Sequence, residues 1–265
     1  MKKKGNKFDL STKRRKKGNY KVYLYGFACV LLAVGSVYFL RLEAFQISEI
    51  QVKGTVNISE TKLEDKLNMI LEGSYIYIIP RASIFFYPKQ EITDYIKSNF
   101  PEAQEFRVSA NPNGVLEVEI LERKPGALWC GGGVCYLMDN TGLVFGRAVE
   151  LDPTFIQYSG LIAGDPVNQR FGQSGFYSDL LALVGKVQSF GLTPRKVQIE
   201  DDSNAVMVLE DGSLIKFISN EVALPGLAEN LRLFLADLKE KNGGANPPFQ
   251  YIDVRYGNKI FYKLK

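Results

Sequence analysis

The pattern of apolar and polar positions divides the chain into one long uncharged run and two regions of shorter, periodic segments. Val22 to Leu40 continues for nineteen residues without a charge. At about 1.5 Å per helical residue, such a run can cross a hydrocarbon core of roughly 30 Å. Its glycines are tolerated in lipid because a helix satisfies its own backbone groups. The pattern therefore predicts one transmembrane helix over residues 22–40.

Residues 45–123 alternate between strand and helix patterns. β-Branched residues that end at Gly54 predict a strand, and two amphipathic stretches predict helices because their apolar residues recur at intervals of three and four. The expected elements are a strand over 45–52, helices after Ser59 and from Pro88 to Phe100, and strands around 106–108 and 116–120. This order predicts a three-stranded sheet covered on one face by two helices.

The segment between these helices, Tyr75 to Tyr87, is rich in aromatic residues. We interpret it as a loop that packs into the core under the helices. Contact with lipid headgroups is the second interpretation, because the predicted membrane helix is close in sequence.

Residues 124–265 change to short strands separated by turns, with two helical stripes among them. Efficient hairpin turns such as Asp211-Gly212 separate alternating segments. Strands are expected over 127–129, 136–138, 143–145, 155–162, 197–199, 206–209, 214–218, 251–256 and 259–263, and helices over 178–190 and 227–238. The whole chain is therefore expected to be α+β, with a transmembrane helix, a small β-α-α-β-β domain and a C-terminal mixed β-domain with flanking helices.

Charge adds a direction to the predicted membrane helix. Residues 1–21 hold ten Lys and Arg and one acid, Asp9, whereas the remainder holds 23 basic and 28 acidic residues. Basic residues that flank a membrane helix remain in the cytoplasm. We therefore expect a cytoplasmic tail over 1–21 and an extracytoplasmic body, and the uneven charge argues against a uniformly basic nucleic-acid binder.

Two other interpretations of the apolar run stay open. A cleaved signal peptide also has a basic start, but it ends in small residues, and Leu40 to Ala44 offers no clear small-x-small site. A buried helix of a soluble domain can be equally apolar, although such a helix seldom follows so dense a basic segment.

The three cysteines separate by position. Cys29 lies inside the apolar run, where it serves as a small apolar residue. Cys130 and Cys135 bracket a short glycine loop, and outside the cytoplasm they could form a disulfide that pins a hairpin. A redox-catalytic pair is less consistent with this spacing, and a metal site would need further ligands.

The composition offers little for catalysis. The chain contains no histidine, which excludes Ser-His-Asp and Cys-His hydrolysis and removes the usual zinc ligand. No phosphate-binding glycine loop is present. The acidic pairs Asp201-Asp202 and Glu117/Glu119 suit a turn and a solvated strand face better than a glycosidase site. We expect no catalytic residue, cofactor, metal or small-molecule substrate.

A membrane-anchored, extracytoplasmic serine-lysine hydrolase is the alternative enzyme hypothesis, because that chemistry needs no histidine. Two Ser-x-x-Lys matches exist, Ser59 with Lys62 and Ser213 with Lys216. Ser59 is better explained as a helix cap, and residues three apart on a strand face opposite sides. The companion motifs of such enzymes are absent from the sequence.

Four segments resemble the FtsQ/DivIB family of bacterial division proteins. They are FQISEIQVKG after the apolar run, LERKPGALW at the junction of the two expected domains, CYLMDNTGLVF, and YIDVRYGNKIFYK near the end. The resemblance implies a POTRA domain over 45–123 and an FtsQ-type β-domain over 124–265. The Cys130/Cys135 pair is not general in that family, so its role there is in doubt.

The resemblance further implies a non-catalytic scaffold of the divisome, located in the cell membrane at the division septum. Its partners would be the bitopic coiled-coil proteins of the FtsB/DivIC and FtsL types and other divisome components, and it would help regulate septal peptidoglycan synthesis. A POTRA module of a translocation system is the competing assignment, but it expects several such units and a β-barrel.

In the family, a partner adds a strand beside the C-terminal strand. The positions that carry this role over are Tyr251, Ile252, Asp253, Val254, Arg255, Tyr256 and Gly257, within the edge region Tyr251 to Lys263. Without the resemblance, Arg255 would be a solvated strand charge and Tyr256 a core ring. An unpaired strand edge offers backbone donors and acceptors that suit such strand addition.

Overall fold

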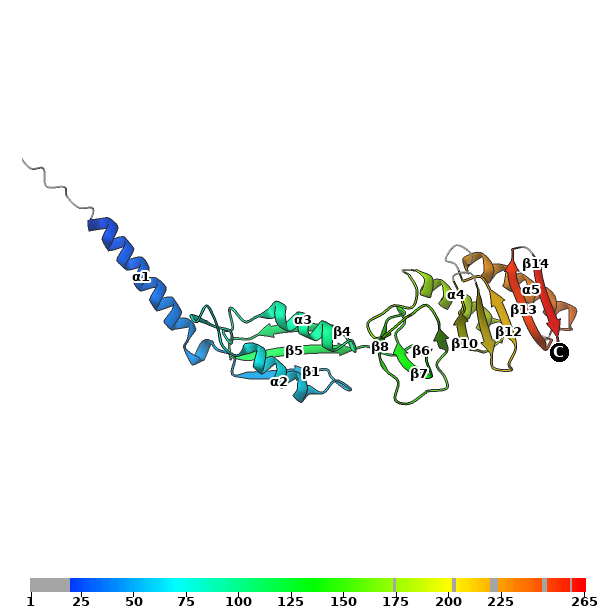
Figure 1. The fold of residues 1–265 in the computed structure, drawn as a ribbon, viewed down its shortest axis with the longest axis horizontal. Coiled ribbons are helices and arrows are strands. Elements are labelled where there is room, and N and C mark those ends of the chain that lie inside the picture. The colour runs from blue at the N-terminus through cyan, green and yellow to red at the C-terminus, as the bar shows by residue number, and fades with distance from the viewer. Residues whose placement is uncertain (1–19, 174, 202–203, 220–223, 245–246, 258) are drawn as a thin grey trace, which may run out of the picture. The chain divides into compact units, whose positions relative to one another are not determined.

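The computed structural model describes residues 20–173, 175–201, 204–219, 224–244, 247–257 and 259–265. The predicted basic tail over 1–21 therefore lies almost entirely outside the described residues. The fold is α+β, with an apolar N-terminal helix and a large mixed β-sheet, as the sequence predicts (Figure 1).

The first helix, α1, covers Tyr20–Leu40. Among the described helices it is the one that is long and apolar enough to cross a membrane, over Lys21–Leu40. None of its apolar window is buried inside the protein. The interpretation of this run as the core helix of a soluble domain is therefore wrong for this structure, because a core helix buries one or more faces against its own chain.

The chain forms two compact units, each made of several segments. The first contains the residues up to Gln51 together with Thr61–Glu91 and Val108–Val118, and the second contains Val52–Glu60, Ile92–Arg107 and Glu119–Lys265. The predicted boundary between residues 123 and 124 stays a prediction.

The elements before residue 124 follow the predicted order. They are a short 3₁₀ turn η1 (Glu43–Phe45), β1 (Glu49–Lys53), α2 (Glu60–Leu71), β2 (Ser74–Tyr75), β3 (Ile79–Pro80), α3 (Lys89–Asn99), β4 (Ala103–Ala110) and β5 (Val115–Glu122). Strand β5 lies in the middle of a three-stranded sheet in the order β1-β5-β4. The first strand begins four residues later than predicted, because Glu43–Phe45 forms the 3₁₀ turn.

The aromatic segment holds a small hairpin that the sequence analysis did not predict. Strands β2 and β3 pair antiparallel, with Tyr75 opposite Ile79. The tip residues Ile76 and Tyr77 are strongly exposed. The prediction that this segment packs into the core is therefore wrong at the hairpin tip.

The remaining elements build one nine-stranded mixed sheet with two helices. They are β6 (Ala127–Gly131), β7 (Val134–Met138), β8 (Val144–Arg147), β9 (Gln157–Ser159), α4 (Phe176–Ser189), β10 (Pro194–Ile199), β11 (Ala205–Leu209), β12 (Leu214–Phe217), α5 (Leu224–Lys241), β13 (Phe249–Tyr256) and β14 (Lys259–Leu264). The strand order is β14-β13-β12-β11-β10-β9-β6-β7-β8. The pairs β6/β9, β9/β10 and β12/β13 are parallel, and the other neighbours are antiparallel.

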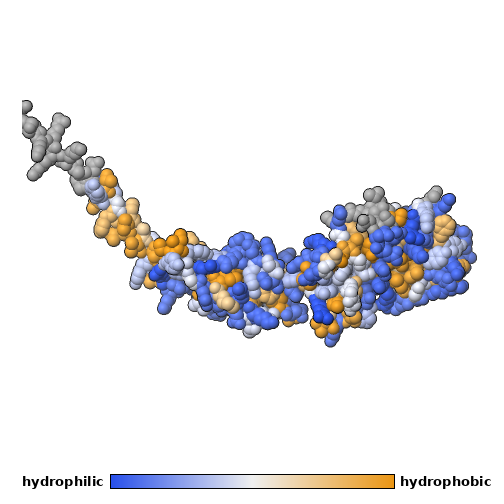
Figure 2. All heavy atoms as spheres, in the orientation of Figure 1, coloured by the Kyte–Doolittle hydropathy of each residue, from blue (hydrophilic) through white to orange (hydrophobic). Residues whose placement is uncertain are grey.

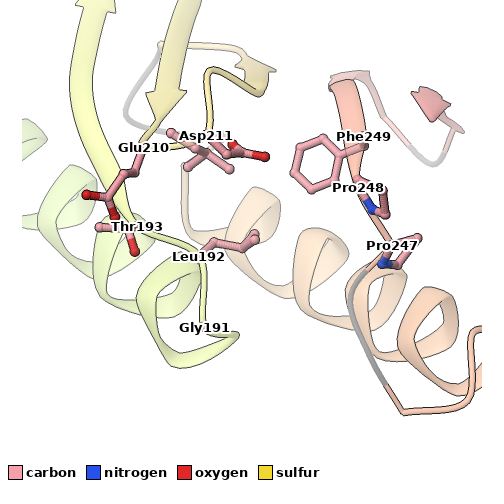
Figure 3. Close-up of a pocket in the computed structure, with 9 residues that line it drawn as sticks. Gly191, Leu192, Thr193, Glu210, Asp211, Pro247, Pro248 and Phe249 are labelled. Atoms are coloured by element: carbon pink, nitrogen blue, oxygen red, sulfur yellow. The ribbon is translucent and has the colours of Figure 1, made fainter. Parts of the chain in front are cut away.

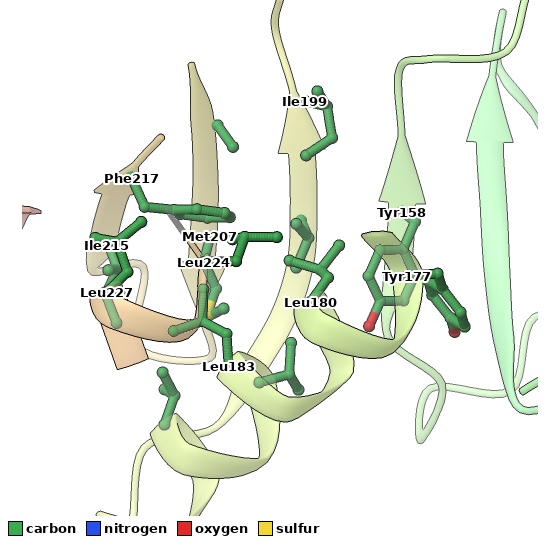
Figure 4. Close-up of a cluster of buried hydrophobic side chains, with 14 of the residues drawn as sticks. Tyr158, Tyr177, Leu180, Leu183, Ile199, Met207, Ile215, Phe217, Leu224 and Leu227 are labelled. Atoms are coloured by element: carbon green, nitrogen blue, oxygen red, sulfur yellow. The ribbon is translucent and has the colours of Figure 1, made fainter. Parts of the chain in front are cut away.

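Helices α4 and α5 bury the apolar face of this sheet (Figure 4). Alternate strand residues such as Met207 and Phe217 face the helical residues Leu180 and Leu183. At one end of the core, Tyr158 and Tyr177 stack edge to face with ring centroids 5.4 Å apart. This shared core holds the C-terminal strands together with the other strands of the nine-stranded sheet.

Strand β9 is shorter than the predicted strand over 155–162. Gly160 ends it with φ +93°, and a Cβ at that position would lie 2.2 Å from the carbonyl oxygen of Ile199. Only glycine tolerates both the left-handed backbone and so close an approach. Leu161 follows with φ +61°, which an extended strand does not allow.

Candidate interaction edge

The C-terminal segment forms a hairpin of two strands with different environments. Strand β13 pairs in parallel with β12 on one edge and antiparallel with β14 on the other. Strand β14 is last in the sheet order, and within the described residues no strand pairs with its second edge. The open hydrogen-bonding edge therefore belongs to Lys259–Leu264.

This topology corrects where the predicted edge lies. The positions Tyr251, Ile252, Asp253 and Val254 are on β13, whose two edges already carry ladder bonds, so they cannot accept another strand. Ile252, Asp253 and Val254 are also buried. Only Tyr256 and Gly257, where the hairpin turns, are exposed. The second half of the predicted region, up to Lys263, does lie at the edge.

Large apolar side chains remain exposed on β14. Phe261, Tyr262 and Leu264 are each about half exposed. The ring of Tyr262 lies 5.2 Å from that of Phe234 on α5, and the ring of Phe261 lies 5.2 Å from that of Tyr256. An exposed edge strand with apolar side chains is a template for pairing with another chain.

The direction of the backbone amides along β14 follows from its last contact. The amide of Lys265 donates to the carbonyl of Pro248, 3.0 Å away, on the side of β13. Because amide directions alternate along a strand, the amides of Tyr262 and Leu264 point to the open edge. Those groups are the ones that an added strand would pair with.

The opposite edge of the sheet is paired, at the start of β8, with another part of the chain. The amide of Val144 on β8 donates to the carbonyl of Gln169 at 2.9 Å, and the amide of Asn168 donates to the carbonyl of Val144 at 2.8 Å. Leu143 and Arg170 form a further bridge. A loop thus pairs with the start of β8, whereas the outer edge of β14 is without a strand along its length within the described residues.

Arg255 is bound within the protein and not free for a partner. Its Nε and Nη2 donate to the two carboxylate oxygens of Asp253 at 2.9 and 2.7 Å, and its Nη1 donates to Oδ1 of Asn204 at 2.8 Å. Burial alone would raise the pKa of Asp253, but the hydrogen bonds from Arg255 hold that pKa below its ordinary value. The hydrogen bond from Arg255 to Asp253 likewise raises the pKa of Arg255. The pair therefore fixes the end of β13 against the loop before β11.

The end of β14 is tied to the turn between β11 and β12. Lys265 Nζ lies 3.0 Å from Oδ2 of Asp211 and 3.1 Å from its carbonyl oxygen. The side chain of Ser213 donates to Asp211 and, together with Lys265, lowers the pKa of Asp211 to about 2. The carboxylate is therefore charged at neutral pH, and the contact holds Lys265 beside the sheet.

A shallow pocket lies next to this turn (Figure 3). It is lined by Gly191, Leu192, Thr193, Leu209, Glu210, Asp211, Pro247, Pro248 and Phe249. Its two carboxylates are paired with cations of the protein, because Glu210 bonds Arg195 and Asp211 bonds Lys265. The pocket therefore presents no free acid or base for chemistry.

The structure does not bring the candidate hydrolase residues together as a site. The hydroxyl of Ser213 is fully buried, 2.7 Å from Oδ2 of Asp211 and 2.6 Å from the carbonyl oxygen of Phe249, and its one proton donates within this turn. Lys216 lies over the ring of Tyr251 at 5.4 Å. Ser59 directly precedes α2, as expected for a capping position. A nucleophile needs an exposed oxygen, which Ser213 lacks, and the lysine of the motif lies over the ring of Tyr251.

Cys130 and Cys135 face one another across β6 and β7 and are joined by a disulfide, with Cα atoms 4.1 Å apart. Among the described residues, no group of His, Cys, Asp and Glu is arranged to hold a metal ion. The disulfide therefore links neighbouring strands of the large sheet.

Strand β14 by itself was not predicted to be the open strand. Its Lys259 and Lys263, followed by Lys265, are one sign that could have identified it, because charged residues, lysine especially, mark edge strands. Phe234 could not have been found from sequence, since its contact with Tyr262 joins α5 to β14.

No protein-family model matches the chain. No curated protein matches it either.

Proposed function

We propose that this protein is a non-catalytic scaffold of the bacterial divisome, of the FtsQ/DivIB type, anchored by α1 with its body outside the cytoplasm. Its partners are bitopic coiled-coil proteins of the FtsB/DivIC and FtsL types, and it helps regulate septal peptidoglycan synthesis. The observation that carries the proposal is the open edge of β14, with exposed apolar side chains at the end of a large sheet.

The anchoring supports this arrangement. Helix α1 is uncharged over its nineteen residues from Val22 to Leu40, and ten basic residues lie within residues 1–21, which favours a cytoplasmic N-terminus. The disulfide between Cys130 and Cys135 suits an oxidising compartment outside the cytoplasm. A body on that side of the membrane can meet the extracytoplasmic parts of bitopic partners.

Strand addition at β14 would use both the outward backbone amides and the exposed side chains of this strand. The outward amides of Tyr262 and Leu264 would supply main-chain hydrogen bonds, and the exposed rings of Phe261 and Tyr262 would supply side-chain contacts. At the other end of this sheet, the start of β8 is already paired with residues 168–170, whereas the outer edge of β14 carries no strand within the described residues.

Leu264→Pro is expected to weaken capture of the coiled-coil partners about tenfold or more, equivalent to ~1.4 kcal/mol. The proline removes an outward donor, whereas the bonds between β14 and β13 remain, because an edge strand tolerates proline on its open side. The measurement is affinity between the full chain in detergent and the purified partners.

Leu264→Ala is the matched control, because it shortens the same side chain and keeps the amide. Both variants should show the thermal unfolding of the wild-type chain. Equal partner affinity for Leu264→Pro and Leu264→Ala would contradict strand addition at β14.

The role in division is tested separately in cells. Depletion of the protein is expected to give filaments, because septation requires the complete scaffold, and a fluorescent fusion should gather at midcell. Microscopy of the native organism measures both. An even membrane signal with normal division would count against the divisome assignment, whatever the result at β14.

A further inference from the structure

The tip of the hairpin β2/β3 has a left-handed backbone at residues that rarely adopt it. Ile76 and Tyr77 adopt φ +50° and +60°, and the amide of Ile78 donates to the carbonyl of Tyr75 at 2.9 Å. Turns of this left-handed kind favour Asn and Gly, since a β-branched residue such as isoleucine is strained there. Strain held at a specific place in a fold is a sign of function.

The same tip exposes apolar surface to solvent. Ile76 is 86% exposed and Tyr77 is 92% exposed. Ile78, Phe85 and Phe86, from the same aromatic segment, are each about half exposed. Local stability would favour a polar tip with small residues, so this sequence is better explained by an apolar environment around the hairpin.

This surface is continuous with the end of α1. The guanidinium of Arg41, directly after α1, donates to the carbonyl oxygens of Tyr77 at 3.0 Å and Ile78 at 3.2 Å. The ring of Phe45 lies 4.2 Å from that of Phe39 and 5.9 Å from that of Phe85.

A shallow apolar hollow, lined by Leu31, Leu32, Gly35, Ser36, Phe39, Leu40 and Phe86, joins the helix to the aromatic segment. Figure 2 shows hydrophobic colouring along α1 that continues onto the part of the molecule beside its end. The apolar hairpin is therefore held at the level where the predicted membrane span ends.

We propose that the tip of the β2/β3 hairpin, with Phe85 and Phe86, inserts into the interfacial region of the lipid bilayer at the extracytoplasmic end of α1. The ligand is the phospholipid surface itself. Tyrosine prefers this interface because its ring is apolar and its hydroxyl is polar. The aliphatic and phenyl side chains reach the acyl boundary, as in proteins that bind a membrane interface.

The consequence is a second membrane attachment of the first compact unit. Arg41 binds the two tip carbonyls and so couples the hairpin to the end of the span. A chain held by α1 alone could rotate freely about the last turn of the helix, whereas a helix and a hairpin together restrict that rotation. This inference rests on the part of the proposed function in which α1 crosses the membrane, and it does not depend on strand addition at β14.

The full chain offers a simple fluorescent probe, because Trp129 is its one tryptophan and is buried. Tyr77→Trp is reconstituted in phosphatidylcholine/phosphatidylglycerol vesicles that contain phosphatidylcholine brominated either near the ester groups or near the chain ends. We expect the added tryptophan to be quenched more by the bromines near the ester groups than by those near the chain ends. We also expect its emission maximum to lie at a shorter wavelength than that of an exposed tryptophan in buffer without detergent. The wild-type chain gives the background from Trp129.

Two matched probes define the outcomes. Leu31→Trp, within α1, should be quenched most by the deep bromines, and Val149→Trp, at an exposed apolar position of the second unit, gives the signal of an exposed probe outside α1 and the hairpin. Quenching at Leu31 without quenching at Tyr77 would overturn the hairpin proposal and leave the membrane span intact. Absence of quenching at both would overturn the span and the hairpin proposal together.

A second variant separates lipid contact from the shape of the turn. Ile76→Asn with Tyr77→Gly installs the residues that the turn favours and removes its apolar side chains. With tryptophan at Phe86 as the probe, we expect this double variant to reduce shallow quenching relative to Phe86→Trp alone. Unchanged quenching in the double variant would show that the tip does not serve as a lipid contact. The same conclusion would follow if the emission of Tyr77→Trp shifted only after the coiled-coil partners were added.

Discussion

Leu235→Ala is expected to lower the free energy of unfolding of the second unit by about 3 kcal/mol. Leu235 lies on α5 and is fully buried in the core that α4 and α5 form with the large sheet. Truncating a buried leucine removes apolar contacts and leaves a cavity that the surrounding side chains fill only in part. Since α5 lies against β13, the change should also loosen the support of the C-terminal hairpin.

Trp129 reports on this unfolding, because it belongs to the same core cluster as Leu235. The control is Leu233→Ala on the same helix, where the side chain is 53% exposed and the loss should stay within about 0.5 kcal/mol. Denaturant titration of the full chain in detergent, followed by tryptophan emission, measures both. Equal losses in the two variants would mean that α5 does not bury this face.

Asp139→Asn is expected to lower the free energy of unfolding by about 3 kcal/mol, because it breaks a buried ion pair. One oxygen of Asp139 accepts hydrogen bonds from the amides of Thr141 and Leu143 at 2.8 and 3.0 Å and from the hydroxyl of Thr141 at 2.7 Å. The other oxygen pairs with Arg123, and both side chains are largely buried. Asparagine preserves the acceptor for the turn but presents a donor to the guanidinium.

Asp152→Asn is the control, because Asp152 accepts the corresponding two hydrogen bonds from Thr154 but is exposed and pairs with no cation among the described residues. Its replacement should leave unfolding close to wild type. Identical unfolding of the two variants would rule out a specific contribution from the pair of Arg123 and Asp139.

The Asp139 contribution also has a defined pH dependence. Burial tends to raise the pKa of Asp139, but hydrogen bonds from Thr141, Leu143 and Arg123 hold it below its ordinary value. The stabilisation is therefore fully present above the unfolded-state pKa of about 3.9 and is lost as the pH falls through the lower folded-state pKa. The wild-type chain should lose stability in acid more steeply than Asp139→Asn, as measured by unfolding titrations at decreasing pH.

Periodicity along the sequence was sufficient to predict most elements. The uncharged run predicts α1, and the three-and-four spacing of Leu63 and Leu67 predicts α2. Strict alternation predicts β5, where Leu116 and Val118 are fully buried. These signals are local, because a helix or strand with one buried face repeats its apolar residues at the period of its own backbone.

Tertiary structure decided which strand of the C-terminal hairpin is open. The alternation of β13 and β14 is similar, and no local pattern states that β12 pairs in parallel with β13 and leaves β14 outermost. The loop that pairs with the start of β8 is likewise remote in sequence, since the amide of Val144 bonds the carbonyl of Gln169. Strand order arises from contacts between distant segments, so the apolar periodicity of a single segment does not determine it.

The same limit applies to the aromatic hairpin. The sequence alone identified an apolar segment near the membrane helix, and burial in the core was the reasonable expectation for such residues. The structure exposes Ile76 and Tyr77 because Arg41 binds their turn beside the end of α1. Sequence determined which residues are apolar, whereas folding determined which of them remain on the surface, because burial depends on the neighbours that the whole chain supplies.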